Sequence, residues 1–253
     1  MVVALASEAR ALLGLGRRQW VNQQKARCLR PADDSRLIIA CAGVGVVNAL
    51  AAAHRLVAQG VSALASSGLA GGLDPHLGPG HIVIATRLLH MDGDKIEGPW
   101  NADPTGVALA HNRLTTEGFP VRCGTMLTAS QEILTRDRKQ SLFGRTQGLA
   151  VDMESAAVAR VAQEVSVPFF CLRVICDPAQ QSVPHQLSRC LDTCGKIRLP
   201  SVLLNLARRP SLAMDIFRLS RNFGSAMPVL RRAWRILISA NLPQQIASMS
   251  QGL

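Results

Sequence analysis

Aromatic and charged residues are scarce in this sequence. Its 253 residues include no tyrosine, and aromatic residues make up 4% and charged residues 18% of the chain. The basic residues are not interleaved with aromatic ones, so the chain lacks the stacking platforms of single-strand nucleic-acid binders, and we predict no nucleic-acid partner. Apolar residues reach 48%, which is enough for one large α/β domain or two small ones.

Long apolar runs are also missing. No stretch reaches the roughly 18 residues of a membrane-spanning helix, and the apolar residues 1–5 are too few for a signal sequence. The seven cysteines are scattered and odd in number, which indicates reduced thiols in a cytoplasmic protein. Cys190 and Cys194 have helical spacing, but no further pair or histidine cluster completes a zinc site.

Acidic residues are few, and the resulting positive charge is concentrated near the end of the chain. The net charge is +11, and the part from Lys196 onwards contributes eight of these charges. Residues 211–224 and 228–241 read as two basic amphipathic helices punctuated by prolines, the second with Trp234 on its apolar side. Two interpretations stay open. The helices could pack on the core, or they could lie in an anionic membrane surface.

The first 195 residues alternate between short apolar runs and helical patterns. Apolar runs predict strands near residues 2–6, 36–42, 61–67, 81–85, 121–129 and 168–176, and helical patterns follow near 7–13, 47–59, 103–118 and 151–165. Strands that are apolar throughout are typical of a mainly parallel sheet covered on both faces. Sites in such sheets lie at the carboxyl ends of the strands.

Several carboxylates and glycines stand at these strand ends. Asp152 and Glu154 could cap the helix that follows them, or Glu154 could accept hydrogen bonds from a ligand hydroxyl pair. Asp177 could be a turn former or a proton donor whose pKa is raised by burial. Glu8 could start a helix or act as a base for water. Residues 68–72 and the Gly-Val-Gly of residues 43–45 would let a flat ligand, a ribose or a phosphate approach the main chain.

These segments together resemble a known superfamily. Residues 67–73 and 77–83 look like the glycine-rich segment of the nucleoside phosphorylase and methylthioadenosine/S-adenosylhomocysteine nucleosidase superfamily. Residues 151–157 resemble its Val-Glu-Met-Glu-Ala motif, and residues 167–169 and 173–177 resemble its Val-Pro-Phe and Arg-x-Ile-Ser-Asp segments. The basic tail and the Ser-Glu-Ala-Arg start are most like the hopanoid-associated phosphorylase group, which acts on adenosylhopane.

The resemblance implies a fold and a set of roles. It implies a three-layer α/β/α catalytic domain over residues 1–197 and a basic helical extension over 198–253. Glu154 would bind the ribose hydroxyls, Met153 would pack on the sugar, Asp177 would protonate N7 of adenine, and Glu8 would activate water beside Arg173. The remaining wall of the pocket would come from Ala70, Gly71 and the backbone of Ile133.

The implied activity is cleavage of the N-glycosidic bond of an adenosine-type nucleoside, with no metal or cofactor. The implied substrate is lipid-linked adenosylhopane, converted to ribosylhopane at the inner face of the bacterial cytoplasmic membrane. The alternatives are a phosphate-dependent phosphorylase, a methylthioadenosine/S-adenosylhomocysteine nucleosidase, and a non-catalytic module that binds nucleosides or membranes. Residues 90–94 resemble a stretch near the nucleosidase dimer interface, so a homo-oligomer is expected.

The sequence departs from the family pattern at three positions near the site. Cys176 replaces the serine before the acid, Leu69 replaces a serine in the glycine-rich segment, and Glu132 stands where an aromatic residue would cover the base. The arginine that some phosphorylases place before the glycine-rich segment is missing. This favours water over phosphate as the nucleophile, although Arg87 or Arg173 could still hold an anion.

Overall fold

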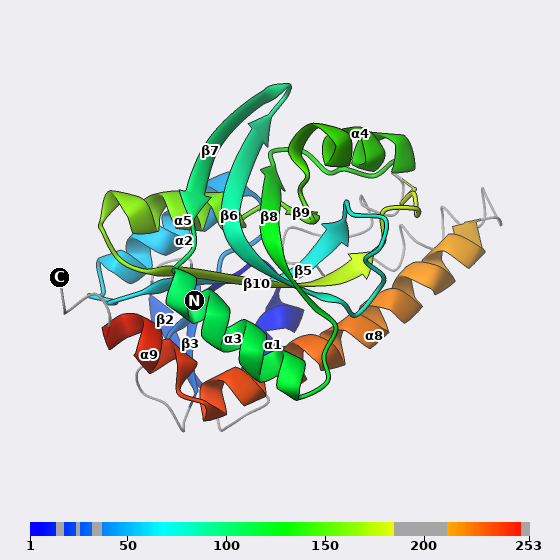
Figure 1. Ribbon diagram of the computed structural model, residues 1–253. Coiled ribbons are helices and arrows are strands. Elements are labelled where there is room, and N and C mark those ends of the chain that lie inside the picture. The colour runs from blue at the N-terminus through cyan, green and yellow to red at the C-terminus, as the bar shows by residue number, and fades with distance from the viewer. Residues whose placement is uncertain (14–17, 24–25, 32–36, 185–211, 249–253) are drawn as a thin grey trace.

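A computed structural model describes residues 1–13, 18–23, 26–31, 37–184 and 212–248. Its described strands form a single sheet (Figure 1). Cys190, Cys194 and the domain boundary expected at residues 197/198 fall outside the described residues. The strands are β1 (Val2–Val3), β2 (Arg18–Gln23), β3 (Ala26–Pro31), β4 (Ile39–Cys41), β5 (Leu64–Gly72), β6 (Ile82–Asp92), β7 (Lys95–Asn101), β8 (Val121–Ala129), β9 (Ala150–Asp152) and β10 (Phe169–Asp177).

The sheet is mixed, not mainly parallel as the apolar strands predicted. Among the described pairings, β1 with β4 and β5, β5 with β10, β6 with β8 and β8 with β9 are parallel. The pairings β5–β9, β6–β10, β6–β7, β2–β3 and β3–β4 are antiparallel. Because β10 pairs with both β5 and β6, the strands β5, β9, β8, β6 and β10 close into a ring. An apolar strand is one that is buried on both faces of the sheet, and this composition does not determine whether the strand runs parallel or antiparallel to its neighbours.

Helices cover both faces of the sheet, which gives the expected α/β architecture (Figure 1). On one face α2 packs against α5, and on the other α8 contacts α1, α3 and β10. The described helices are α1 (Ala6–Leu13), α2 (Val46–Val57), α3 (Pro104–Thr116), α4 (Arg136–Thr146), α5 (Ser155–Glu164), α8 (Leu212–Ser239) and α9 (Leu242–Ser248). None of these helices is both long enough and apolar enough to cross a membrane.

The helix expected over residues 151–165 is shorter, because its first residues belong to the sheet. Val151 lies in β9 and pairs with Gly71 of β5, and α5 begins at Ser155. Strands β2, β3 and β7 and helix α4 were not predicted from the sequence. Helix α4 has a clear local signal: the Thr135 hydroxyl accepts a hydrogen bond from the N–H of Arg138 at 3.3 Å, as an N-cap residue does.

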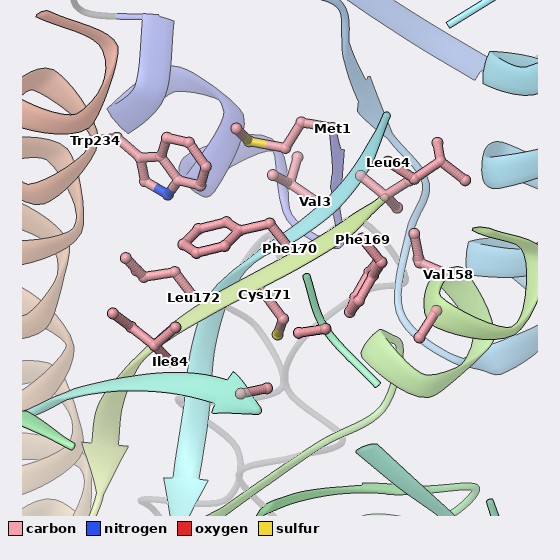
Figure 2. Packing of buried hydrophobic residues seen from close by; sticks show 14 of the residues in the cluster. Met1, Val3, Leu64, Ile84, Val158, Phe169, Phe170, Cys171, Leu172 and Trp234 are labelled. Atoms are coloured by element: carbon pink, nitrogen blue, oxygen red, sulfur yellow. The ribbon is translucent and has the colours of Figure 1, made fainter. Parts of the chain in front are cut away.

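The two helices expected near the C-terminus are one continuous helix, α8, with Pro228 inside it. Proline removes one intrahelical hydrogen bond, but Gly224, whose carbonyl loses its partner, is solvent-exposed and can bond to water. The second half of α8 packs on the core. Trp234 is 2% exposed and meets Phe170 edge-to-face at 6.0 Å between ring centroids (Figure 2). Its indole N–H donates to the Ser67 hydroxyl at 2.6 Å. This apolar stripe is therefore covered by the sheet.

Candidate active site

The pairing of β5 with β10 brings the glycine-rich segment beside the predicted acid. In this parallel register Arg173 lies opposite Gly68, and Asp177 lies opposite Gly71. A side chain at Gly68 would overlap both the Arg173 guanidinium and the Glu8 carboxylate, so only glycine leaves room for this pair. The two strands thus place Gly71 and Asp177 side by side at their carboxyl ends, and Arg173 and Glu8 lie against Gly68 further back along the strands.

A pocket of about 240 Å³ opens at this end of the sheet. Of the predicted residues, Gly71, Ile133, Met153 and Asp177 line it. Helix α8 adds two apolar residues that were not predicted from the sequence. The rest of the wall comes from the loop after β8, from β9, from the end of β10 and from the segment after it. The other lining residues are Gln131, Glu132, Leu134, Val151, Asp152, Cys176, Val183, Leu219 and Phe223.

A second group of predicted residues lies next to this pocket and is deeply buried. Glu8, Glu154 and Arg173 are 2%, 4% and 1% exposed. Asp152 links the two groups, because it lines the pocket and its Oδ2 lies 2.8 Å from Arg173 Nη2. Ala70 is also buried, and its carbonyl faces the Cys176 thiol at 3.5 Å from Sγ.

Arg173 sits at the centre of a buried polar network. Its Nη2 lies 2.8 Å from Asp152 and 3.5 Å from Glu154 Oε2, and it donates to the hydroxyls of Ser66 and Ser155 at 2.9 and 3.1 Å. Burial opposes the charged form of the guanidinium, but Asp152 and Glu154 outweigh it and raise the pKa of Arg173. The arginine is therefore a fixed positive charge whose donors are already in use.

Of the two carboxylates that the sequence offered as caps for helix α5, Asp152 makes the capping bonds. Its Oδ1 accepts the N–H groups of Glu154 and Ser155, each at 3.2 Å, and the hydroxyl of Thr128 at 2.7 Å. Glu154 occupies the N-cap position but makes no capping bond with its side chain. Its carboxylate instead accepts the N–H of Gly45 at 2.9 Å. Glu154 is thus free of the helix and points toward the Gly-Val-Gly turn.

Burial raises the pKa of both buried glutamates, Glu8 and Glu154. Burial raises the pKa of Glu8, while Arg173 and the N–H groups of Leu5 and Leu69, at 2.9 and 2.8 Å from the carboxylate, oppose the rise. Burial raises the pKa of Glu154 to about 7, opposed by Arg173 and supported by Asp152. A carboxylate with a raised pKa is a competent general base near neutral pH.

This raised pKa makes the stability of the protein depend on pH. The folded state binds a proton at Glu154 between pH 4.5 and about 7 that the unfolded state has released, so the free energy of unfolding falls as the pH rises through this range. We expect Glu154→Gln to remove up to about 3 kcal/mol of that fall. Urea unfolding at pH 5, 6, 7 and 8 measures it. The exposed Glu164→Gln is the control, and equal slopes for wild type and Glu154→Gln would contradict the assignment.

Asp177 is held by two side chains at the edge of the pocket. Its Oδ2 lies 2.7 Å from the Nζ of Lys139, and its Oδ1 lies 3.1 Å from the Cys176 thiol. Cysteine thus keeps the donor position expected of serine, although a thiol is a weaker donor. Lys139 was not predicted, because a lysine within Arg-Asp-Arg-Lys reads as one of several exposed charges on a helix.

Comparisons with known proteins identify the family of this chain. The profile of the phosphorylase superfamily matches residues 30–194. The chain belongs to this superfamily. A 5'-methylthioadenosine/S-adenosylhomocysteine nucleosidase of Oceanobacillus iheyensis is 26% identical over 190 residues, which cover 70% of this chain and 82% of the relative. An aminodeoxyfutalosine nucleosidase of Helicobacter pylori is 28% identical over 161 residues, covering 58% and 70%.

Solved structures of the superfamily share the fold. The crystal structure of the Helicobacter pylori methylthioadenosine/S-adenosylhomocysteine nucleosidase, bound to a 4-aminopyrrolopyrimidine ligand, matches with a TM-score of 0.74 over 94% of this chain and 96% of that chain, at 17% identity. A Streptococcus pyogenes S-adenosylhomocysteine nucleosidase in complex with 5-methylthiotubericidin gives a TM-score of 0.65, at 22% identity over 91% and 94%. The three-layer nucleoside phosphorylase-like fold expected from the sequence is confirmed.

Proposed function

We propose that this superfamily member is a purine nucleosidase that uses water to release adenine from an adenosine-type nucleoside. The observation that carries the proposal is a pair of carboxylates on the two sides of β5, Asp177 at the end of β10 and Glu8 in α1, just after β1. Asp177 stands at the pocket edge, and Glu8 lies in the buried group beside Arg173. The relatives are named as 5'-methylthioadenosine/S-adenosylhomocysteine and aminodeoxyfutalosine nucleosidases, which supports the same type of reaction here.

The reaction breaks the C1'–N9 bond, whose electron pair leaves with the base. Asp177 supplies a proton to N7, so adenine departs as a neutral molecule. The oxygen of water bonds to C1', and its proton passes to Glu8. The carboxylate of Glu154 accepts hydrogen bonds from the ribose hydroxyls, which replace its bond from the Gly45 N–H. Its negative charge stabilises the oxocarbenium-like sugar.

Remaining pocket residues orient the substrate. Met153, Gly71 and Ile133 line the space in which the sugar and the base would lie, and Ala70, the residue before Gly71 in β5, is buried. A side chain at Gly71 would come within 3.0 Å of the Asp177 carboxylate. Glycine at this position therefore keeps the acid accessible to a flat base.

The charges at the site favour water over phosphate as the nucleophile. Four carboxyl groups, those of Glu8, Asp152, Glu154 and Asp177, face two cations, Arg173 and Lys139. Both cations already bind carboxylates. A phosphate dianion would therefore find no unpaired cation among these residues, whereas the carboxyl groups can stabilise a cationic transition state.

Helix α8 supports a lipid-linked substrate such as adenosylhopane, which would become ribosylhopane in hopanoid biosynthesis. Leu219 and Phe223 add an apolar wall to the pocket. On the same half of the helix, Met214 and Phe217 are 58% and 64% exposed, next to the exposed Arg218 and Arg221. Exposed apolar side chains flanked by arginines suit the interface of an anionic bilayer, such as the inner face of the cytoplasmic membrane.

Adenine release by the wild-type protein tests this proposal. The substrates are adenosylhopane in anionic vesicles and methylthioadenosine in solution, each with and without phosphate. We expect adenine from adenosylhopane at a rate that phosphate does not change, because water is the nucleophile. The product should be the free sugar, which has no phosphate ester.

Other results of this experiment would revise the proposal in defined ways. Release that requires phosphate would make the protein a phosphorylase and overturn the argument from charge. Cleavage of methylthioadenosine alone would keep the nucleosidase and reject the lipid-linked substrate. Binding without release of adenine from either substrate would contradict an enzyme and support a non-catalytic binding module.

A further inference from the structure

Lys139 of α4 is a fully buried ammonium, which is an uncommon place for a lysine. Its Nζ lies 2.7 Å from Asp177 Oδ2 and within 3.3 Å of the carbonyl oxygens of Asp177, Pro178 and Gln181. An ammonium has three N–H donors, and the three carbonyls alone would satisfy them. The shortest contact nevertheless goes to the carboxylate of the leaving-group acid.

Residues 178–183, which follow β10, are hydrogen-bonded to α4 and to the loop before it. The N–H of Val183 bonds to the Leu134 carbonyl at 2.8 Å, and the N–H of Arg136 bonds to the Ser182 hydroxyl at 3.1 Å. Gln181 also accepts the side-chain amide of Asn222 on α8 at 2.9 Å. Lys139 thus contacts both the predicted acid, Asp177, and the segment after it, which is hydrogen-bonded to α4 and to α8.

We infer that Lys139 is a positioning residue for the leaving-group acid. This inference rests on the proposed function, since it assigns Lys139 a task in the departure of adenine. The ammonium fixes Asp177 Oδ2 by a charge-assisted bond, which leaves Oδ1 as the oxygen that serves N7. The thiol of Cys176 at Oδ1 is a weak donor and cannot orient the carboxylate by itself.

A residue that acts through Asp177 should show it in a double-mutant cycle. The variants are Lys139→Met, Asp177→Asn and the pair of both, with Lys139→Gln as a second replacement that keeps a donor for the carbonyls. Arg138→Met is the matched control, because Arg138 is the preceding residue of α4 and is 40% exposed. The measurements are kcat and KM for adenine release, together with the melting temperature of each variant.

We expect Lys139→Met to lower kcat about 10- to 100-fold through loss of orientation, with a change in KM below about threefold. The double variant should match Asp177→Asn within about threefold, since a misplaced carboxylate and a missing one fail in the same step. Arg138→Met should behave like wild type. Lys139→Gln should fold even if Lys139→Met does not. Its combination with Asp177→Asn should likewise have the kcat of Asp177→Asn alone within about threefold.

Two results would overturn the inference. One is a kcat for both Lys139 variants within threefold of wild type. The other is a double variant whose loss equals the product of the single losses, since Lys139 would then act on the fold and not through Asp177. A wild-type protein that releases no adenine would instead overturn the proposed function, so the two failures are distinguishable.

Discussion

Glu8→Gln is expected to lower kcat/KM for adenine release by about 10³-fold or more, because it removes the group that takes the proton from water. The glutamate is held by the N–H groups of Leu5 and Leu69, one on each carboxylate oxygen. An amide can accept only one of these bonds, and its NH₂ cannot take up the proton. The measurement is steady-state adenine release between pH 6 and pH 8.

The matched control for Glu8 is Glu164→Gln. Glu164 is a glutamate on α5 that pairs with Arg160 at 2.8 Å on the surface. The control should keep wild-type kinetics, and melting temperatures separate loss of chemistry from loss of fold. If Glu8→Gln keeps more than about a tenth of the wild-type rate, another group must activate the water and the assignment of Glu8 is wrong.

Much of this site could be predicted because its residues stand at the ends of apolar strands. The run before Asp177 is apolar except for Arg173, and the run before Gly68 combines apolar residues with small serines, so both are typical of buried strands. Neighbouring buried strands that end in glycines and a carboxylate place those groups at one edge of a sheet. The β5–β10 register does bring Gly71 beside Asp177.

What could not be predicted depends on contacts between distant segments. Lys139 is separated from Asp177 by 38 residues, and only the fold shows that its ammonium is buried. Strand direction failed for a similar reason, since the antiparallel pairing of β5 with β9 depends on where the chain turns before Ala150. The periodicity and composition of a segment indicate its own secondary structure, but they do not indicate which distant segment it pairs with.

The C-terminal helix shows where amphipathicity alone misleads. The stripes around Leu219 and Trp234 look alike in the sequence, and for both the pattern left open whether the helix packs on the core or lies in a membrane surface. In the structure Trp234 is buried against Phe170, whereas Leu219 faces the pocket. One helix therefore contributes to the core with one half and to the substrate pocket with the other, so changes in its first turns should affect substrate choice before they affect stability.

Asp177→Asn is expected to lower kcat for adenine release by about 10²- to 10³-fold, because the base would then leave without a proton at N7. The loss should depend on the leaving group. A nitrophenyl riboside loses a phenolate that needs no proton, so its cleavage should fall less than about fivefold. The ratio of the two rates in wild type and variant measures the contribution of the acid.

This ratio separates acid catalysis from simple support of the pocket. Asp177 also bonds to Lys139 at 2.7 Å, so its replacement could loosen the segment after β10. A loosened pocket would slow both substrates equally, whereas a missing proton donor slows only the adenine nucleoside. Equal losses on the two substrates would show that Asp177 shapes the pocket and that adenine departs with the help of another group.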